Sequence, residues 1–158
     1  MNEQQHETYM KEALSLARKA AQMNEVPVGA IIVRNGEIIA QAANFREQGH
    51  DATAHAETLA IRAACQSLGT WRLSDCELYV TLEPCPMCAG AIVNSRIKRV
   101  IYGVKDARGG AMGSVMNLCS YPLFFKPDVI GGICEEACRE VLHSFFEKQR
   151  NREKKITL

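Results

Sequence analysis

The first hydrophobic pattern along the chain has the spacing of a helix. Met10, Leu14, Ala17 and Ala21 follow one another at steps of three and four residues. At this spacing the four side chains lie on one face of an amphipathic helix, with polar residues on the opposite face. We therefore predict a helix over residues 7–23.

The hydrophobic period then shortens. Residues 28–33 read VGAIIV, residues 37–43 read EIIAQAA, and Asn35-Gly36 lies between them. Asn-Gly between two apolar, β-branched segments is a strong signal for a two-residue hairpin turn. We predict an antiparallel pair of strands at this position.

Helices and strands alternate after the hairpin. The composition of residues 44–53 and 105–114, rich in polar residues or glycine, indicates loops. We predict helices over 54–68 (with Gly69 as its C-terminal cap), 86–94 and 134–151, and strands over 77–82, 99–104 and part of 127–132. This alternation favours an α/β domain with helices on both faces of a mixed sheet. Neither a repeat nor a long linker interrupts residues 1–158, so we expect a single domain.

Composition agrees with a soluble domain. The 158 residues are 47% hydrophobic and 23% charged, with a net charge of +1, so bulk charge alone indicates neither a nucleic-acid nor a membrane partner. No apolar segment approaches the about 18–20 residues of a membrane span. The first residues resemble no signal peptide, and we expect a cytoplasmic protein with reduced cysteines. The C-terminal tail, about 148–158, is basic.

Two short motifs carry metal-binding chemistry: HAE at 55–57 and PCPMC at 84–88. Cys85 and Cys88 have the C-x-x-C spacing that brings two thiolates to one ion, and zinc prefers Cys and His ligands. Each motif lies at a predicted strand-to-helix junction, and such junctions meet at one edge of an α/β sheet. We predict a zinc ion bound by His55, Cys85 and Cys88.

The number of ligands indicates catalysis. A structural zinc takes four ligands from the protein, whereas a catalytic zinc takes three and leaves one position for water. Glu57 then has a role as the acid–base group that moves protons between water and leaving group. His55 and Glu57 share a site only at the irregular start of a helix, which Thr53 as a nearby cap would allow. The full pattern H-x-E…P-C-x-x-C is the signature of zinc nucleobase deaminases.

A non-catalytic alternative remains open. A fourth ligand from the other cysteines would close the site and give a zinc module that binds RNA or protein. Those cysteines are Cys65, Cys76, Cys119, Cys134 and Cys138. Cys134 and Cys138, four residues apart on a predicted helix, are candidates for a second metal site, although buried cysteines more commonly pack as small apolar side chains.

Longer segments resemble a known family. EVPVGAIIV, TAHAE, WRLSDCELYVTLEPCPMCAGAIVNSRI, VIYGVKDARGGAMGS and FFEKQR are together similar to the bacterial tRNA-specific adenosine deaminases of the cytidine deaminase-like superfamily. The resemblance covers roughly residues 7–150. It implies a three-layer α/β/α fold with a five-stranded mixed sheet, a homodimer with one Zn²⁺ per subunit, and conversion of adenosine to inosine at the wobble position of a tRNA anticodon stem-loop.

The resemblance also implies substrate contacts, at Asn44, Ala56, Asp106, Ala107, Arg108, Phe146 and Arg150. Asn44 would contact the flipped nucleoside and the loop at Asp106 the target nucleotide. Of the adjacent Phe145 and Phe146, only one can easily face RNA on a helix, and we favour Phe146 for stacking on loop bases. Structural alternatives are a turn cap for Asp106 and a solvated helix end for the basic tail.

One stretch departs from the family pattern. Family members carry an Asn-His pair before the last strand, where this chain has Phe125-Lys126. The motifs HDATAHAE and EPCPMC also suit deaminases of free purines such as guanine. A deaminase of a free purine base or nucleoside is therefore the alternative to a tRNA deaminase.

Overall fold

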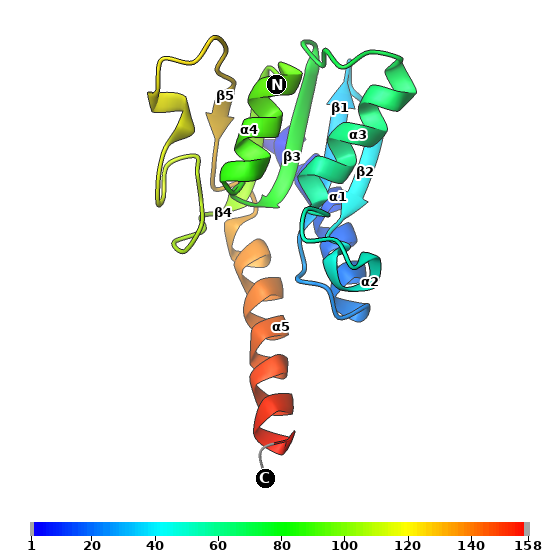
Figure 1. Ribbon diagram of the computed structural model, residues 1–158, viewed down its shortest axis with the longest axis vertical. Coiled ribbons are helices and arrows are strands. Elements are labelled where there is room, and N and C mark those ends of the chain that lie inside the picture. The colour runs from blue at the N-terminus through cyan, green and yellow to red at the C-terminus, as the bar shows by residue number, and fades with distance from the viewer. Residues whose placement is uncertain (1, 157–158) are drawn as a thin grey trace.

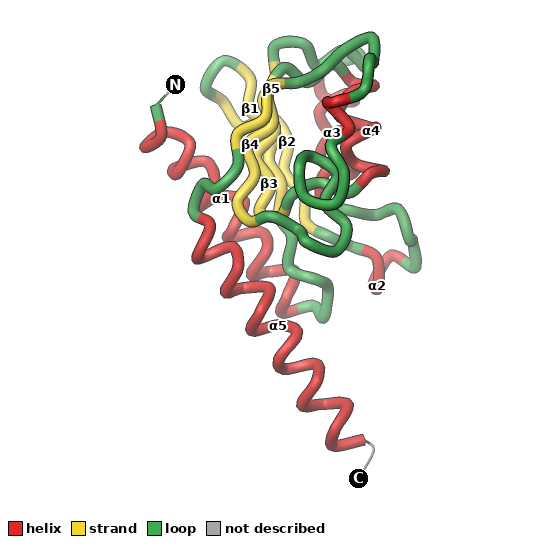
Figure 2. Tube along the Cα trace, turned by 90° about the vertical axis from the view of Figure 1, so that its left-hand side faces the viewer, coloured by secondary structure: helices red, strands yellow, loops and turns green. Residues whose placement is uncertain are grey.

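The computed structural model describes residues 2–156, which are built around a five-stranded mixed sheet in the order β2-β1-β3-β4-β5 (Figure 1, Figure 2). The strands are β1 Gly29–Arg34, β2 Glu37–Ala43, β3 Cys76–Leu82, β4 Arg99–Val104 and β5 Asp128–Ile130. β1 runs antiparallel to both β2 and β3, whereas β3, β4 and β5 are parallel. The predicted mixed sheet of five strands is confirmed.

The hairpin between β1 and β2 turns at the predicted dipeptide. Asn35 has φ 51° and Gly36 has φ 79°. Both residues are therefore in the left-handed region, as a type I′ turn requires. Such a turn matches the twist of the flanking strands, so the sequence signal and the observed geometry have the same cause.

Helices cover both faces of the sheet. α3 (Ala56–Leu68) and α4 (Pro86–Ser95) lie on the front face in Figure 1, whereas α1 (Glu3–Gln22) and the first turns of α5 (Glu135–Ile156) pack on the back. Neighbouring residues of a strand point to opposite faces, and on β1 both faces are buried. Ile31 packs in the core under α1, with Met10 and Leu14, and Ile32 packs in the core under α3. The predicted three layers are confirmed.

The ends of two helices differ from the prediction. α1 begins at Glu3, four residues earlier than expected. Its first turn is closed by a capping box, in which Asn2 Oδ1 accepts from the Gln5 N–H and Gln5 Oε1 accepts from the Asn2 N–H, both at 3.0 Å. Polar caps extend a helix beyond its apolar stripe, which is why periodicity alone placed the start too late. α5 likewise continues beyond residue 151 to Ile156.

One predicted loop and one stretch without a prediction contain short helical turns. α2 (Arg46–Gly49) lies within 44–53, and a 3₁₀ turn, Leu118–Ser120, lies in the long connection between β4 and β5. Neither segment has the apolar periodicity that a sequence reading needs. Both lie outside the sheet, so the predicted set of five strands is unaffected.

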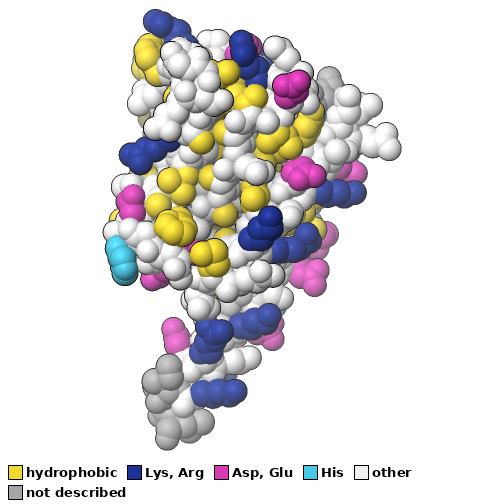
Figure 3. Space-filling model, turned by 90° about the vertical axis from the view of Figure 1, so that its right-hand side faces the viewer, with side chains coloured by type: hydrophobic (Ala, Val, Ile, Leu, Met, Phe, Trp, Pro, Cys, Tyr) yellow, Lys and Arg dark blue, Asp and Glu magenta, His cyan; other side chains and the backbone are white. Residues whose placement is uncertain are grey.

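The last helix projects away from the sheet. In Figure 1 the C-terminal half of α5 extends below the other elements, and Figure 3 shows Lys and Arg side chains gathered along this projection. Its exposed basic residues are Lys148, Arg150, Arg152, Lys154 and Lys155. Arg152 Nη1 donates to Asn24 Oδ1 at 2.9 Å, which ties the helix to the end of α1. Within residues 2–156, no helix combines the length and the apolar character that crossing a membrane requires.

Candidate active site

Two helix N-termini meet at the carboxyl end of β3. His55 is the N-cap residue of α3, and Cys85 is the N-cap residue of α4, followed by Pro86 in the first turn. Proline favours this position because its fixed φ suits the first turn and its missing N–H needs no partner there. The unpaired N–H groups of a helix start favour an anionic sulfur, which suits the thiolates of a C-x-x-C motif.

The three predicted ligands converge. His55 Nδ1 lies 3.6 Å from Cys85 Sγ and 3.5 Å from Cys88 Sγ, and the three ligand atoms lie within 4.8 Å of one another. A tetrahedral zinc with bonds of about 2.3 Å to sulfur and 2.0–2.1 Å to nitrogen separates the nitrogen from each sulfur by about 3.6 Å. The donor set and its spacing therefore fit zinc. Among residues 2–156 this is the one cluster that can hold a metal, and no fourth His, Cys, Asp or Glu belongs to it.

The two thiols share a proton unequally. A hydrogen bond from Cys88, together with one from His55, lowers the pKa of Cys85 to about 4. The same interaction with Cys85, reinforced by burial, raises the pKa of Cys88 above its usual range. Metal ions bind cysteine as thiolate, so loading this cluster releases the proton that the two thiols retain.

Glu57 lies beside the cluster in the first turn of α3, with 4% of its surface exposed. Burial raises the pKa of its carboxyl group to about 7. A carboxyl group with a pKa near the working pH both accepts and releases protons readily, as acid–base catalysis requires. Glu57 is outside the ligand cluster, which agrees with an acid–base role rather than coordination.

His55, Glu57 and Cys85 line a small cavity of about 140 Å³, together with Asn44 and Asp106. Asn44 is buried, and its Oδ1 accepts from the Ala56 N–H at 2.8 Å. This bond satisfies a free N–H at the start of α3 and therefore takes the capping role that we had considered for Thr53. Ala56, which we expected to contact the substrate, is fully buried and is not among the residues that line the cavity.

A larger groove of about 520 Å³ adjoins the cavity along α5. The two spaces share Val26, Leu82 and Asp106 as lining residues. The groove is also lined by Ala107, Arg108 and Phe146, so four of the predicted substrate residues lie together. Phe146 is 42% exposed and Phe145 only 7%, which is the division expected for adjacent residues on a helix. Arg150 is exposed one turn further along α5.

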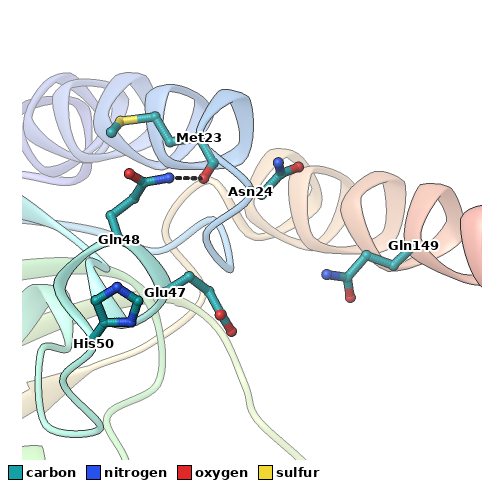
Figure 4. Close-up of a pocket in the computed structure, with 6 residues that line it drawn as sticks. All are labelled: Met23, Asn24, Glu47, Gln48, His50 and Gln149. Carbon is teal, nitrogen blue, oxygen red and sulfur yellow. Dashed lines mark hydrogen bonds between the residues drawn. The ribbon is translucent and has the colours of Figure 1, made fainter.

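A third hollow, of about 440 Å³, lies where the end of α1, α2 and α5 approach one another (Figure 4). Its lining is mostly polar: Asn24, Glu47, Gln48, His50 and Gln149, together with Met23. Gln48 Nε2 donates to the Met23 carbonyl at 3.4 Å. A smaller space lined by Asn24, Asn44 and Gln149 connects it with the catalytic cavity. The groove thus adjoins the cavity directly, whereas this hollow is separated from it by the smaller space.

Two buried glutamates near the site were missed from the sequence. Glu25, 1% exposed, accepts from the N–H groups of Glu47 and Gln48 at 3.0 and 2.8 Å and so holds the start of α2. Glu83, 2% exposed, accepts hydrogen bonds from the loop that carries Asp106. Each glutamate borders an apolar strand and stands next to or near a proline, in EVP and LEP. The signal that the sequence offered for these two residues was a charged side chain at the end of a buried strand.

The comparisons with known proteins identify the family. Residues 3–104 match the model of the cytidine and deoxycytidylate deaminase zinc-binding region. The chain belongs to this deaminase family. It is therefore a hydrolytic deaminase with a zinc site, and His55, Cys85 and Cys88 can bind one zinc ion.

Individual relatives extend the match over nearly the whole chain. The deaminase is 51% identical over 151 residues to the tRNA-specific adenosine deaminase of Bacillus subtilis (strain 168), which covers 95% of this chain and 94% of the relative. A solved structure from studies of A-to-I editing by tRNA:A34 deaminases at the wobble position of transfer RNA has a TM-score of 0.83. That structure is 46% identical, over 85% of this chain and 99% of the other. The predicted family and fold are confirmed.

A more distant relative is a free-base enzyme. The solved guanine deaminase from Bacillus subtilis is 37% identical to this chain, with a TM-score of 0.61, over 78% of this chain and 88% of the other. The sequence departure at Phe125-Lys126 lies in the connection between β4 and β5. Within the described residues, neither side chain lines the catalytic cavity or the groove beside α5.

Proposed function

We propose that this enzyme converts adenosine to inosine at the wobble position of a tRNA anticodon. The observation that carries the proposal is a 140 Å³ cavity at the zinc ligands that adjoins a larger groove of about 520 Å³ along α5. A base flipped out of an RNA loop fits such an arrangement, because its neighbours remain attached and need space outside the cavity. The relatives named as tRNA adenosine deaminases support the same substrate.

The reaction adds water to C6 of adenine and releases ammonia. A zinc ion held by His55, Cys85 and Cys88 supplies Lewis acidity that lowers the pKa of water to near neutral. Glu57 takes one proton from the attacking water and delivers it to the ring nitrogen. It then takes the proton of the hydroxyl now on C6 and passes it to the amine, so that ammonia leaves as the C6 carbonyl forms. Its raised pKa suits it to each of these transfers.

Residues outside the cavity would hold the RNA. The exposed ring of Phe146 is placed to stack on a loop base, and Arg108 and Arg150 carry charges that can meet phosphates. Asp106, at the boundary between cavity and groove, is placed to contact the target nucleotide. Asn44 would contact the nucleoside while it holds Ala56 at the start of α3.

The substrate is tested by comparing turnover of RNA with turnover of free bases. The zinc-loaded enzyme is incubated with an arginine-tRNA anticodon stem-loop, and separately with free purines and pyrimidines, and inosine and ammonia are measured. We expect inosine in the RNA, with affinity that falls as salt rises because phosphate contacts release counter-ions. Ammonia from a free base with no inosine in RNA contradicts the proposal.

Guanine or a related free purine is the second candidate. It is favoured by the small volume of the catalytic cavity and by the 37% identity to a guanine deaminase. A free-base enzyme has no use for the basic projection of α5, so its turnover should be insensitive to salt. The non-catalytic zinc module considered from the sequence is not supported, because the chain belongs to a deaminase family and the cluster has three protein ligands.

We also propose that residues 1–158 act as one domain, within a cytoplasmic homodimer that holds one zinc per subunit. Support for the dimer comes from the outer face of α3 and α4, where Ile61, Met87 and Ala91 line a hollow and Met87 is 39% exposed. An exposed apolar side chain beside a hollow with further apolar lining often marks a subunit contact. The cytoplasm is where a tRNA anticodon would be met. Analytical ultracentrifugation of the wild-type protein and of Met87→Glu tests the dimer, since a charge at its centre should produce monomers.

A further inference from the structure

Glu83 is a buried carboxylate between β3 and the zinc ligand Cys85. Its side chain is 2% exposed, and none of the ion pairs within residues 2–156 includes it. Burying a charge without a counter-ion is costly unless hydrogen bonds replace the lost water. The partners of this carboxylate therefore show what it holds in place.

All of its hydrogen-bond donors come from one loop, residues 105–116. Glu83 Oε1 accepts from the Asp106 N–H at 3.1 Å and from the Ser114 hydroxyl. Glu83 Oε2 accepts from the N–H groups of Met112 at 3.0 Å and Ser114 at 3.1 Å. Both ends of the loop are thus bonded to a single side chain that also lines the catalytic cavity.

The backbone of the loop is shaped around the carboxylate. A Cβ atom on Gly110 would lie 2.4 Å from Glu83 Cδ and Oε2, which is closer than atoms can approach. Glycine is therefore required at this position. The Gly110 carbonyl also accepts from the N–H groups of Val115 and Met116, so the loop closes on itself over the carboxylate.

Asp106 connects this loop with the substrate. It lines both the catalytic cavity and the groove beside α5, and its Oδ1 accepts from the N–H groups of Arg108 and Gly109. We propose that Glu83 is a positioning residue, which fixes loop 105–116 against the metal-binding turn and so sets where Asp106 meets the substrate. The inference rests on the proposed function in that this loop contacts the target nucleotide.

A double-mutant cycle tests the proposal. In Glu83→Gln the side chain keeps its size, but its NH₂ group cannot accept hydrogen bonds from the backbone N–H groups of the loop. The loop therefore loses part of the hydrogen bonding that holds it in place. We expect kcat/KM to fall roughly ten- to a hundredfold, the range associated with a misplacement of about 1 Å at an active site. In an Asp106→Ala background the same substitution should change kcat/KM by less than about threefold, because the group that Glu83 positions is already gone.

A loss of equal size in both backgrounds, or no loss in either, overturns the proposal. Hydrogen exchange is a second test that does not depend on turnover. The amides of residues 105–116 should exchange faster in Glu83→Gln, while those of α3 and β3 stay protected. Unchanged exchange in the loop contradicts the positioning role of Glu83. The matched control is Glu77→Gln. Glu77 is a second buried glutamate, at the other end of β3, and it pairs with Arg99 at 2.9 Å. Loss of this ion pair in Glu77→Gln should lower the stability of the protein but leave kcat/KM and the hydrogen exchange of loop 105–116 unchanged.

The cycle is measured on the substrate that the wild-type enzyme turns over best among the anticodon stem-loop and free purines. Absence of inosine in RNA then counts against the proposed function alone. The kinetic coupling between Glu83 and Asp106 still decides whether Glu83 positions the loop.

Discussion

Replacing Glu57 by glutamine is the sharpest perturbation of the proposed chemistry. The substitution keeps the shape of the side chain and removes its ability to move a proton. Because burial raises the pKa of Glu57 to about 7, the folded protein already tolerates an uncharged group at this position. We therefore expect Glu57→Gln to fold normally and to bind zinc stoichiometrically, since the carboxylate is outside the ligand cluster.

The size of the effect follows from the surroundings of the carboxylate. General acid–base catalysis contributes about 10²–10⁴-fold, which corresponds to roughly 3–5 kcal/mol of activation free energy. The other two carboxylates that line the cavity are already engaged. Both oxygens of Glu83 accept hydrogen bonds from the loop, and Asp106 Oδ1 accepts two backbone N–H groups. Because these bonds hold both carboxylates to the loop, we expect neither to replace Glu57, and we expect a loss near the upper limit.

The assay measures single-turnover inosine formation in the anticodon stem-loop, with zinc quantified in the same samples. Glu37→Gln, an exposed glutamate on β2, is the matched control and should retain wild-type activity. Zinc-loaded Glu57→Gln that keeps more than about one tenth of the wild-type rate would refute the acid–base role, because that loss is smaller than any proton-transfer contribution of the expected size.

Three further changes test the metal, the RNA contact and a buried histidine. Cys88→Ala should lose stoichiometric zinc together with activity, and metal analysis that still finds one zinc per chain contradicts the ligand assignment. Arg150→Gln should reduce the slope of log affinity against log salt by about one for the stem-loop, whereas exposed Lys11→Gln on α1 should not change it. His6 contacts the Tyr79 hydroxyl at 2.7 Å, and burial lowers its pKa. The folded protein thus binds the His6 proton less tightly than the unfolded chain, so the free energy of unfolding decreases as pH falls below about 6.5. Urea unfolding of the zinc-free proteins should show a smaller decrease for His6→Gln than for the wild type. Equal pH dependence in both proteins contradicts this role of His6.

Local signals were sufficient to predict most of the sheet. The turn at Asn35-Gly36 requires left-handed backbone at both positions, and few dipeptides adopt it, so sequence and geometry correspond closely. Ile31 and Ile32 are both buried, as the uninterrupted apolar run of β1 predicts for a strand covered on two faces. In each case the determining interaction lies within a few residues of the signal.

The elements that were missed depend on distant partners. α2 has only four residues and no apolar stripe, and it is held by Glu25, about twenty positions earlier in the chain. The start of α3 is capped by Asn44 rather than by the closer Thr53. Hydrogen bonds of this kind carry no period in the sequence, so they become visible only when the fold brings their partners together.

The walls of the catalytic cavity therefore differ in how they are held. The zinc ligands stand on α3 and α4, whose apolar faces are buried in the core, and a change there would disturb the whole sheet. The segments beside the cavity, α2 and loop 105–116, each bond to one buried carboxylate, Glu25 and Glu83 respectively, in addition to their other contacts. Replacing such a loop costs a few hydrogen bonds and leaves the zinc site intact. This separation gives a physical reason why proteins of one fold, sharing 37% of their residues, act on a free base in one case and on RNA in the other.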